Sequence, residues 1–200
     1  METALNAVWD SELPENANIC VIGAGIVGLL TAYLAQKMSG QTVTVIDINP
    51  KRKKQADILG LNFLTPHMAK IENVGQFNRL VNTSASEKGL QLALDLADFE
   101  ARITEMSWYG DKQVSLNLGG SFHSKRLQII SSQVGHISPS KRDTTTHAMR
   151  MTEALSYLKD EKLDCLLEPE IAFEELPDCL HELFSDKSDA LCQVVTYKSD

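Results

Sequence analysis

One stretch of this 200-residue chain, residues 18–49, constrains the possible fold more than any other. An apolar run at Ile19–Ile22 leads into a Gly-x-Gly-x-x-Gly pattern, and an apolar helical segment follows that ends near Gly40. A second run, rich in β-branched residues, covers residues 42–46 and ends at Asp47. A strand, a glycine turn, a helix and a strand with a terminal acid are the arrangement typical of a dinucleotide-binding unit.

The three glycines have different predicted roles. Gly23 makes the tight turn, Gly25 lets the backbone approach a diphosphate, and Gly28 lets the helix pack close to the sheet. The unpaired amides at the start of the helix, including those of Ile26 and Val27, then face the phosphates together with the positive end of the helix dipole.

Asp47 predicts which dinucleotide is bound. It lies 19 residues beyond Gly28, where a carboxylate accepts hydrogen bonds from the adenosine ribose hydroxyls. Its charge repels a 2′-phosphate, so the pattern favours NAD over NADP. The basic run at residues 51–54 leaves NADP as an alternative, although such a run on a helix is more often a solvated face. Within this run, Arg52 is best placed to reach the adenosine, and Ile48 is also predicted to contact the cofactor.

The composition excludes several classes of protein. A net charge of −8 argues against general binding to nucleic acid or to anionic membranes. No apolar run approaches the ~20 residues that a membrane helix needs, and the acidic N-terminus does not resemble a secretory signal. We therefore expect a cytoplasmic protein. The four cysteines lie far apart without metal-ligand spacing, which predicts free thiols rather than a metal site or a disulfide framework.

Strand and helix patterns alternate along the first three quarters of the chain. A helix at residues 1–10 and a linker precede the first strand, and a short helix is expected within residues 67–76. The main helices are predicted at 50–60, 87–97 and 146–159, and further strands at 61–65, 77–81, 101–106, 113–118 and 127–130. This spacing predicts an α/β fold, a doubly wound, mostly parallel Rossmann sheet of order 3-2-1-4-5-6 with helices on both faces.

Ligands of such sheets bind at the carboxyl ends of the strands. The residues predicted there, on the path from the diphosphate to the nicotinamide, are Thr83, Ser84, Ser107, Ser132 and Gln133. After residue 160 the pattern changes to a strand at 166–173, a helix at 176–184 and a strand at 191–197, too few elements for a separate core. The predicted divisions are a lead-in at 1–17, a Rossmann domain at 18–160 and a C-terminal segment at 161–200.

Longer motifs make almost the whole chain similar to the medium-chain, zinc-dependent alcohol dehydrogenases. They are METALNAVWD at 1–10, VIGAGIVG at 21–28, DINPKRKKQADILG at 47–60, SWYGDKQVSLNLGGSFHSKRLQIISSQVG at 107–135 and FEELPDCLHELFSDKSDALC at 173–192. The branch that the chain resembles most is a bacterial group of zinc-binding dehydrogenase-like proteins related to the bacteriochlorophyllide dehydrogenases.

In that family an N-terminal catalytic domain binds zinc, and a hydride passes between an alcohol or carbonyl substrate and the nicotinamide. The resemblance implies that this chain is the NAD(H)-binding part with a remnant of the catalytic domain, inactive alone, and that zinc belongs only to a full-length form. It also implies that Thr3 lies near the nicotinamide, that Asp47 and Arg52 hold the ribose, and that a homodimer forms through the edge strand at 113–118. It assigns no catalytic residue.

Two other functions fit parts of the sequence. The segment VIGAGIVGLLTAYLA also resembles the start of FAD-dependent amine oxidases, and a non-enzymatic NAD-binding or interaction module needs no catalytic domain. His123 is a candidate base, but it has no neighbouring nucleophile or acid, so a surface position is expected. Trp108 and Tyr109 are able to stack on a ligand, although packing at a strand end is the stronger expectation.

Overall fold

The computed structural model of the chain describes residues 1–72, 74, 77–185 and 188–197. The chain divides into two compact units, Met1–Lys159 and Asp160–Asp200. The first unit contains a six-stranded sheet and the second a two-stranded sheet. The ends of the segments predicted at 67–76 and 161–200 lie partly outside the described residues.

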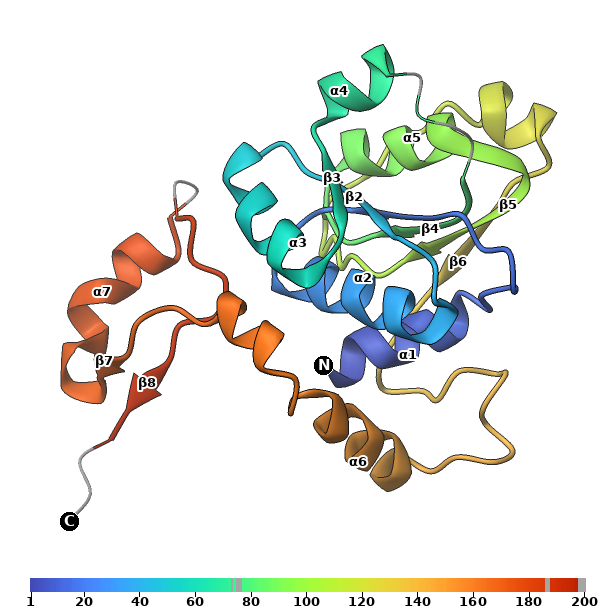
Figure 1. The fold of residues 1–200 in the computed structure, drawn as a ribbon. Helices are drawn as coiled ribbons and strands as arrows, with labels where there is room; N and C mark the ends of the chain where they lie inside the picture. The colour runs from blue at the N-terminus through green and yellow to red at the C-terminus, as the bar shows by residue number, and fades with distance from the viewer. Residues whose placement is uncertain (73, 75–76, 186–187, 198–200) are drawn as a thin grey trace. The chain divides into compact units, whose positions relative to one another are not determined.

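The six-stranded sheet has the predicted order, β3-β2-β1-β4-β5-β6, and all its neighbouring strands are parallel (Figure 1). Its strands are β1 (Ile19–Ile22), β2 (Thr44–Ile46), β3 (Asn62–Leu64), β4 (Phe77–Asn82), β5 (Ala97–Glu105) and β6 (Gln128–Ser131). In the middle of the sheet, Val21 of β1 lies between Val45 of β2 and Val81 of β4. Because β1 pairs with β2 on one side and β4 on the other, the strand order reverses there, and a crevice opens at the carboxyl end of β1.

The helices cover both faces of the sheet, with α1 and α2 on one face and α5 on the other (Figure 1). Their bounds are α1 (Glu2–Asp10), α2 (Ile26–Ser39), α3 (Lys53–Leu59) after the 3-10 turn η1 (Pro50–Arg52), α4 (Pro66–Ile71), α5 (Glu87–Leu96) and α6 (His147–Tyr157). Two side chains cap the starts of helical segments: Asn49 accepts from the Lys51 amide, and Ser86 accepts from the Gly89 amide. Gly40 ends α2 in the left-handed conformation that favours glycine.

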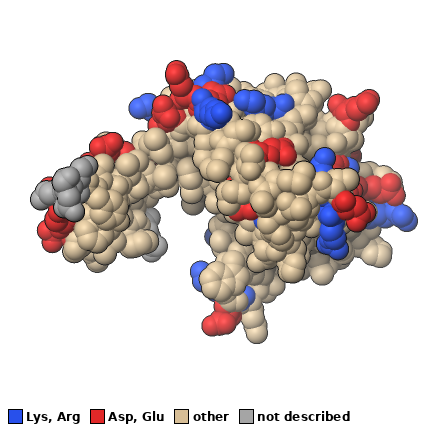
Figure 2. Space-filling view, turned by 90° about the horizontal axis from the view of Figure 1, so that it is seen from below, with Lys and Arg blue, Asp and Glu red and all other residues tan. Residues whose placement is uncertain are grey.

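Apolar side chains from β1 fill the core on both faces. Ile19, Cys20 and Val21 are completely buried. Cys20 belongs to the cluster between the sheet and α5, and burial raises the pKa of its thiol, so it stays protonated and unreactive. All four cysteines are free thiols, as predicted. Figure 2 shows one face of the surface, where acidic and basic side chains lie together in mixed groups.

The prediction of a strand at residues 113–118 is wrong. This segment runs as an irregular loop, and its last residue begins a short π-helical turn, η2 (Leu118–Phe122). Val114 and Leu116 still pack against the core, which explains their alternation in the sequence. The backbone, however, bonds to α5 instead of a strand, since the Ser115 amide donates to Glu87 Oε2 at 3.0 Å.

Two other expectations differ in extent. β5 begins at Ala97, directly after α5, rather than at residue 101, because the short apolar positions Ala97 and Ala101 are both completely buried against the core. The segment between β6 and α6, predicted as a polar loop, buries Ile137 and Ser138.

The second unit contains the 3-10 turns η3 (Glu161–Leu166) and η4 (Phe173–Glu175), the helix α7 (Leu176–Leu183) and the strands β7 (Ile171–Ala172) and β8 (Val195–Thr196). β7 and β8 are parallel, so the unit is the predicted strand–helix–strand arrangement with shorter strands. An isolated bridge joins Leu167 to Cys192, and the rings of Phe173 and Tyr197 stack with their centroids 4.9 Å apart.

Candidate functional site

The glycine turn between β1 and α2 forms the centre of the site. Gly23 has φ +101°, and a Cβ there would lie 2.6 Å from the Thr83 hydroxyl oxygen. A Cβ at Gly28 would overlap the carbonyl oxygen of Gly23, so this position requires glycine for close packing. Gly25 differs from both, because a Cβ there would meet no protein atom within 4 Å. Its backbone therefore faces open space at the N-terminus of α2, where a phosphate group would be stabilised.

A cavity of about 830 Å³ lies at the carboxyl ends of β1, β2 and β4. It collects seven of the residues predicted to bind the cofactor: Gly23, Gly25, Asp47, Ile48, Arg52, Thr83 and Ser84. Ile26, Val27 and Gly28 belong to the first turn of α2 beside it, and do not line it. The cavity thus brings together groups from residues 23–84, at the place where the strand order reverses.

Asp47 is held by backbone amides at the mouth of this cavity. Its Oδ2 accepts a hydrogen bond from the Ala24 amide at 2.6 Å, and its Oδ1 accepts one from the Asn49 amide at 2.7 Å. These bonds fix the carboxylate beside the glycine turn, and each oxygen keeps a further lone pair for a hydroxyl donor. The next side chain, Ile48, is 85% exposed, which leaves it available to contact a flat ring.

Thr83 and Ser84 support the site from the end of β4. The Thr83 hydroxyl lies within hydrogen-bond distance of the carbonyl oxygens of Ile22 and Gly23, at 3.0 and 3.1 Å, and so fixes the glycine turn. The Ser84 hydroxyl donates to Asn82 Oδ1 at 2.8 Å. Both hydroxyls therefore bond to the protein itself, and their first role is to hold the shape of the turn.

A second polar group lies at the carboxyl ends of β4 and β5. The buried Asn82 side chain donates to Glu105 Oε2 at 2.7 Å, and the Tyr109 hydroxyl donates to the same oxygen at 3.1 Å. Burial, and then the negative charge of Glu105, raise the pKa of Tyr109 to about 12. Ser107 joins this group, since its amide donates to Glu105 Oε1 at 2.7 Å and its hydroxyl accepts from the Ala85 amide at 3.0 Å.

Ser132 and Gln133 lie further along the same edge, after β6. The Ser132 amide donates to the Glu105 carbonyl oxygen at 2.9 Å, and its hydroxyl donates to Asp10 Oδ2 at 2.7 Å. Gln133 is exposed, and its side-chain oxygen accepts from the Gly135 amide. The predicted residues thus fall into three groups: one lines the cavity, one forms the first turn of α2 beside it, and one follows the ends of β5 and β6.

Several groups at the site were not predicted. Glu87, Gln91 and Asp95 lie four residues apart on α5 and line the cavity, and Gln91 also accepts a hydrogen bond from the Asn117 amide. Their i, i+4 spacing is visible in the sequence as a polar stripe opposite the apolar one. Lys70 of α4 lines the cavity as well, and no pattern in the chain around it indicates this position.

The candidates beside strand ends have different environments. Trp108 is 90% exposed, so the expectation that it packs at the strand end is wrong. Tyr109 does pack there, half-buried, through the bonds described above. His123 is exposed after η2, as expected.

The described residues contain no group of three or more His, Cys, Asp or Glu side chains that would hold a metal ion. A catalytic zinc therefore does not fit the side chains of this part of the chain. A dinucleotide does fit, because Gly25 leaves its backbone open to a phosphate and Asp47 stands fixed beside it.

Comparisons with known proteins agree with this geometry. A family model described as the C-terminal domain of alanine dehydrogenase/PNT matches residues 6–90. Galactitol 1-phosphate 5-dehydrogenase of Escherichia coli K12 is 28% identical over 134 residues, which cover 62% of this chain and 39% of that protein. The chain is therefore similar to a dehydrogenase over about three fifths of its length. It matches well under half the length of this curated relative.

Solved alcohol dehydrogenase structures share the fold. Galactitol-1-phosphate dehydrogenase from Escherichia coli superposes with a TM-score of 0.75 at 22% identity, over 94% of this chain and 56% of that one. A short chain alcohol dehydrogenase of Escherichia coli CFT073, complexed with NADH, superposes with a TM-score of 0.74 at 20% identity, over 97% of this chain and 56% of that one. What the chain shares with these alcohol dehydrogenases is the Rossmann architecture, and the predicted fold is confirmed.

Proposed function

We propose that this chain binds NAD(H) as the cofactor-binding part of an alcohol dehydrogenase-like oxidoreductase. One observation carries the proposal: the Asp47 carboxylate is fixed by the Ala24 amide at the mouth of an 830 Å³ cavity, beside the open backbone of Gly25. A fixed acid accepts two ribose hydroxyls, and an open helix N-terminus stabilises a diphosphate. The relative whose structure contains NADH supports the same choice of cofactor.

The shape of the site suggests how the dinucleotide lies. The adenosine occupies the cavity beside Asp47 and Ile48, and Arg52 lines the same space. The diphosphate crosses the glycine turn, and the nicotinamide extends toward Ser107 and Ser132 at the ends of β5 and β6. Asp47 favours NAD over NADP, since a 2′-phosphate would meet its negative charge.

In the whole protein, the reaction is a hydride transfer between an alcohol or carbonyl substrate and the nicotinamide. Zinc would belong to a full-length form, and we propose that these 200 residues alone do not oxidise alcohols, because the described side chains include no metal-ligand group. The homodimer and the cytoplasmic location stay predictions. The described residues contain no helix that is long and apolar enough to span a membrane.

The experiment that tests the proposal is an NADH titration followed by nicotinamide fluorescence, with Asp47→Ala beside the unaltered chain. We expect saturable binding, weakened about tenfold or more by Asp47→Ala, since a hydrogen bond to a charged group contributes roughly 1.5–3 kcal/mol. Asp57→Ala is the matched control. Asp57 is 55% exposed in α3, pairs with Lys53, and does not line the cavity. Equal affinity in all three proteins would contradict the proposal.

A second measurement separates the related functions. The chain is assayed with NAD, a panel of alcohols and added zinc. Binding without turnover supports a cofactor-binding part that is inactive alone, and also the simpler interaction module. Turnover would contradict the proposed inactivity. A yellow purified protein with flavin absorbance would instead favour FAD.

A further inference from the structure

A buried arginine, Arg150 of α6, lies behind the turn that follows β6. It is 1% exposed. Its Nε and Nη2 donate to Glu2 Oε1 at 3.1 and 2.9 Å, and its Nη1 donates to Asn6 Oδ1 at 2.6 Å. The remaining contacts are to the carbonyl oxygens of Val134, at 2.6 Å, and His136, at 3.4 Å. These five contacts match the five N–H groups of a guanidinium, which are all satisfied.

The acceptors on α1 form a polar stripe along one side of that helix. Glu2, Asn6 and Asp10 follow one another at intervals of four residues, and Asn6 and Asp10 are buried. Asn6 Nδ2 donates to Asp10 Oδ2 at 3.0 Å, and the same oxygen accepts from the Ser132 hydroxyl. A continuous set of hydrogen bonds therefore connects Arg150 to the end of β6.

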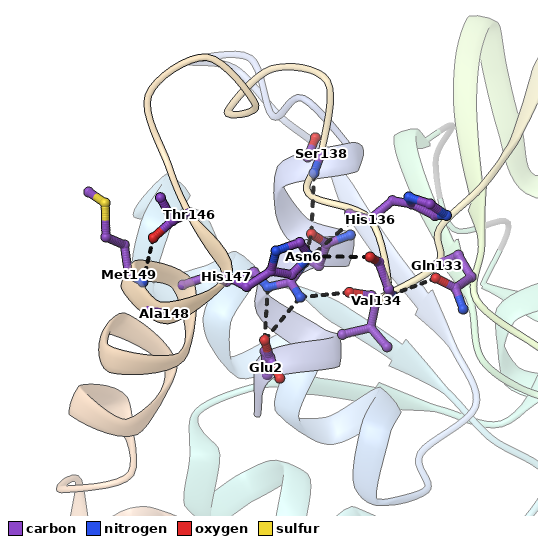
Figure 3. A network of polar contacts seen from close by, with 12 residues as sticks. Glu2, Asn6, Gln133, Val134, His136, Ser138, Thr146, His147, Ala148 and Met149 are labelled. Atoms are coloured by element: carbon purple, nitrogen blue, oxygen red, sulfur yellow. Dashed lines mark hydrogen bonds and ion pairs between the residues drawn. The ribbon is translucent and has the colours of Figure 1, made fainter.

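The turn at residues 132–136, here called the β6 turn, is held from this side at several points. In Figure 3 the backbone of Val134 and His136 lies beside Glu2 and Asn6, while the ring of His136 is turned away from them. His147, at the start of α6, adds a contact from its Nε2 to the Gly135 carbonyl oxygen at 3.2 Å. Three successive carbonyl groups of the β6 turn thus bond to α6.

Burial of a guanidinium among these acceptors costs solvation energy unless every donor is paired. A hydrophobic residue of similar size would pack α6 on α1 without that cost. It would leave the two carbonyl groups of the β6 turn without a donor, however, and the turn would lose its fixed position. The arrangement is therefore better suited to fixing a backbone position than to stabilising the helix contact.

We propose that Arg150 is a positioning residue for the nicotinamide half of the cofactor. By fixing the β6 turn, it sets the positions of Ser132 and Gln133 at the edge of the site. The inference rests on the proposed function, since it assumes that a dinucleotide extends from the cavity to this edge. Arg150 lies on α6 behind the turn and does not line the cavity, so it acts on the cofactor only through the turn.

The test compares two ligands that share the adenosine diphosphate part. ADP-ribose lacks the nicotinamide, and NADH contains it, so calorimetric titration with both separates the two halves of the site. In Arg150→Lys the charge stays but the five-donor fork is lost. We expect NADH affinity to fall about tenfold, because a displaced β6 turn would lose roughly one hydrogen bond to the nicotinamide half. ADP-ribose affinity should change less than about twofold. NADH fluorescence enhancement should fall with the affinity.

Two further variants keep the inference falsifiable. Glu2→Gln tests the same contact if Arg150→Lys does not fold, because it keeps an oxygen acceptor at a side chain that is 25% exposed. It should also weaken NADH more than ADP-ribose, by a smaller factor than Arg150→Lys. Arg126→Lys is the control, because Arg126 is 73% exposed and pairs with Glu100 away from the β6 turn. Equal weakening of both ligands, or unchanged NADH affinity in a folded variant, would overturn the inference. Failure of the unaltered chain to bind ADP-ribose would instead contradict the proposed function, and the inference with it.

Discussion

The adenosine half of the site takes its glycine turn and its acid from one continuous segment, residues 22–52, whereas the half at the ends of β5 and β6 is held together by groups from distant segments. Gly23, Gly25 and Asp47 are set by one βαβ unit, so their geometry follows from local rules of turn and helix formation. Ser132, by contrast, depends on Asp10, and the turn around it depends on Arg150. The first half therefore tolerates changes elsewhere in the fold, and the second half should be sensitive to them.

The largest expected effects come from alanine substitutions in the glycine turn, where one glycine is needed for folding and another for ligand binding. Gly28→Ala should destabilise the protein by about 3 kcal/mol or prevent folding, since the new Cβ would overlap the Gly23 carbonyl oxygen. Gly25→Ala adds the same methyl group where no protein atom lies within 4 Å. Thermal unfolding and NADH titration of both variants make the comparison.

For Gly25→Ala we expect stability within about 0.5 kcal/mol of the unaltered chain, because its φ of −71° suits alanine, and a loss of NADH affinity of about tenfold or more. If Gly25→Ala bound NADH with unchanged affinity, the proposed position of the diphosphate at this turn would be contradicted. A fully stable Gly28→Ala protein would contradict the close packing of α2 on β1.

The next prediction concerns the other half, where Tyr109 bonds to Glu105. Burial and the Glu105 charge raise the pKa of Tyr109 from 10.0 to about 12 in the folded protein. The neutral phenol is thus favoured in the folded state, so its contribution to stability is complete below pH 10 and is lost as the pH rises through 12. Tyr109→Phe should remove a late step of tyrosinate ionisation, near pH 12, from the ultraviolet absorbance.

The same variant should make the fall in the free energy of unfolding between pH 10 and pH 12 shallower. Tyr197→Phe removes an exposed tyrosine of the second unit, and as the control it should leave the step near pH 12 in place. If Tyr109→Phe leaves the ionisation curve above pH 11 unaltered, with allowance for one tyrosine fewer, the bond to Glu105 does not form in solution.

The contrast between the two halves also explains what the sequence was able to predict. The alternation of strands and helices, from which the strand order was predicted, and the roles of Gly23 and Gly28 depend on local patterns in the chain. The helix caps at Asn49 and Ser86 also depend on residues close in the chain. The prediction of a strand at 113–118 was wrong, because alternating apolar residues indicate only that one side of a segment is buried. They do not show whether its backbone pairs with a strand or, as here, bonds to a helix side chain.

The buried polar groups were the hardest to foresee. Nothing near Arg150 in the sequence distinguishes it from the charged residues of an exposed helix, because its acceptors come from α1 and the β6 turn. The bond between Asn82 and Glu105 likewise has no local signal in the sequence, because it forms only when β4 pairs with β5 in the sheet. Pairs far apart in the chain carry no periodic pattern that a single sequence reveals.

The smallest expected effect tests whether the basic run after Asp47 belongs to the adenosine half or to the solvated surface. Lys53 pairs with Asp57 at 2.6 Å, with side chains 60% and 55% exposed, whereas Arg52 is half-buried and lines the cavity. Lys53→Ala should change stability by less than about 0.5 kcal/mol, since exposed pairs in a helix contribute little.

The same substitution should leave NADH affinity within about twofold, while Arg52→Ala should weaken NADH several-fold through a contact of about 1 kcal/mol. NADPH provides the sharper readout, because a 2′-phosphate would be drawn to any lysine that turns toward the ribose. If Lys53→Ala lowered NADPH affinity more than NADH affinity, the run would take part in cofactor choice. Equal, small changes for both cofactors would leave Asp47 and Arg52 as the polar side chains that set the adenosine half, with Lys53 part of the solvated face of α3.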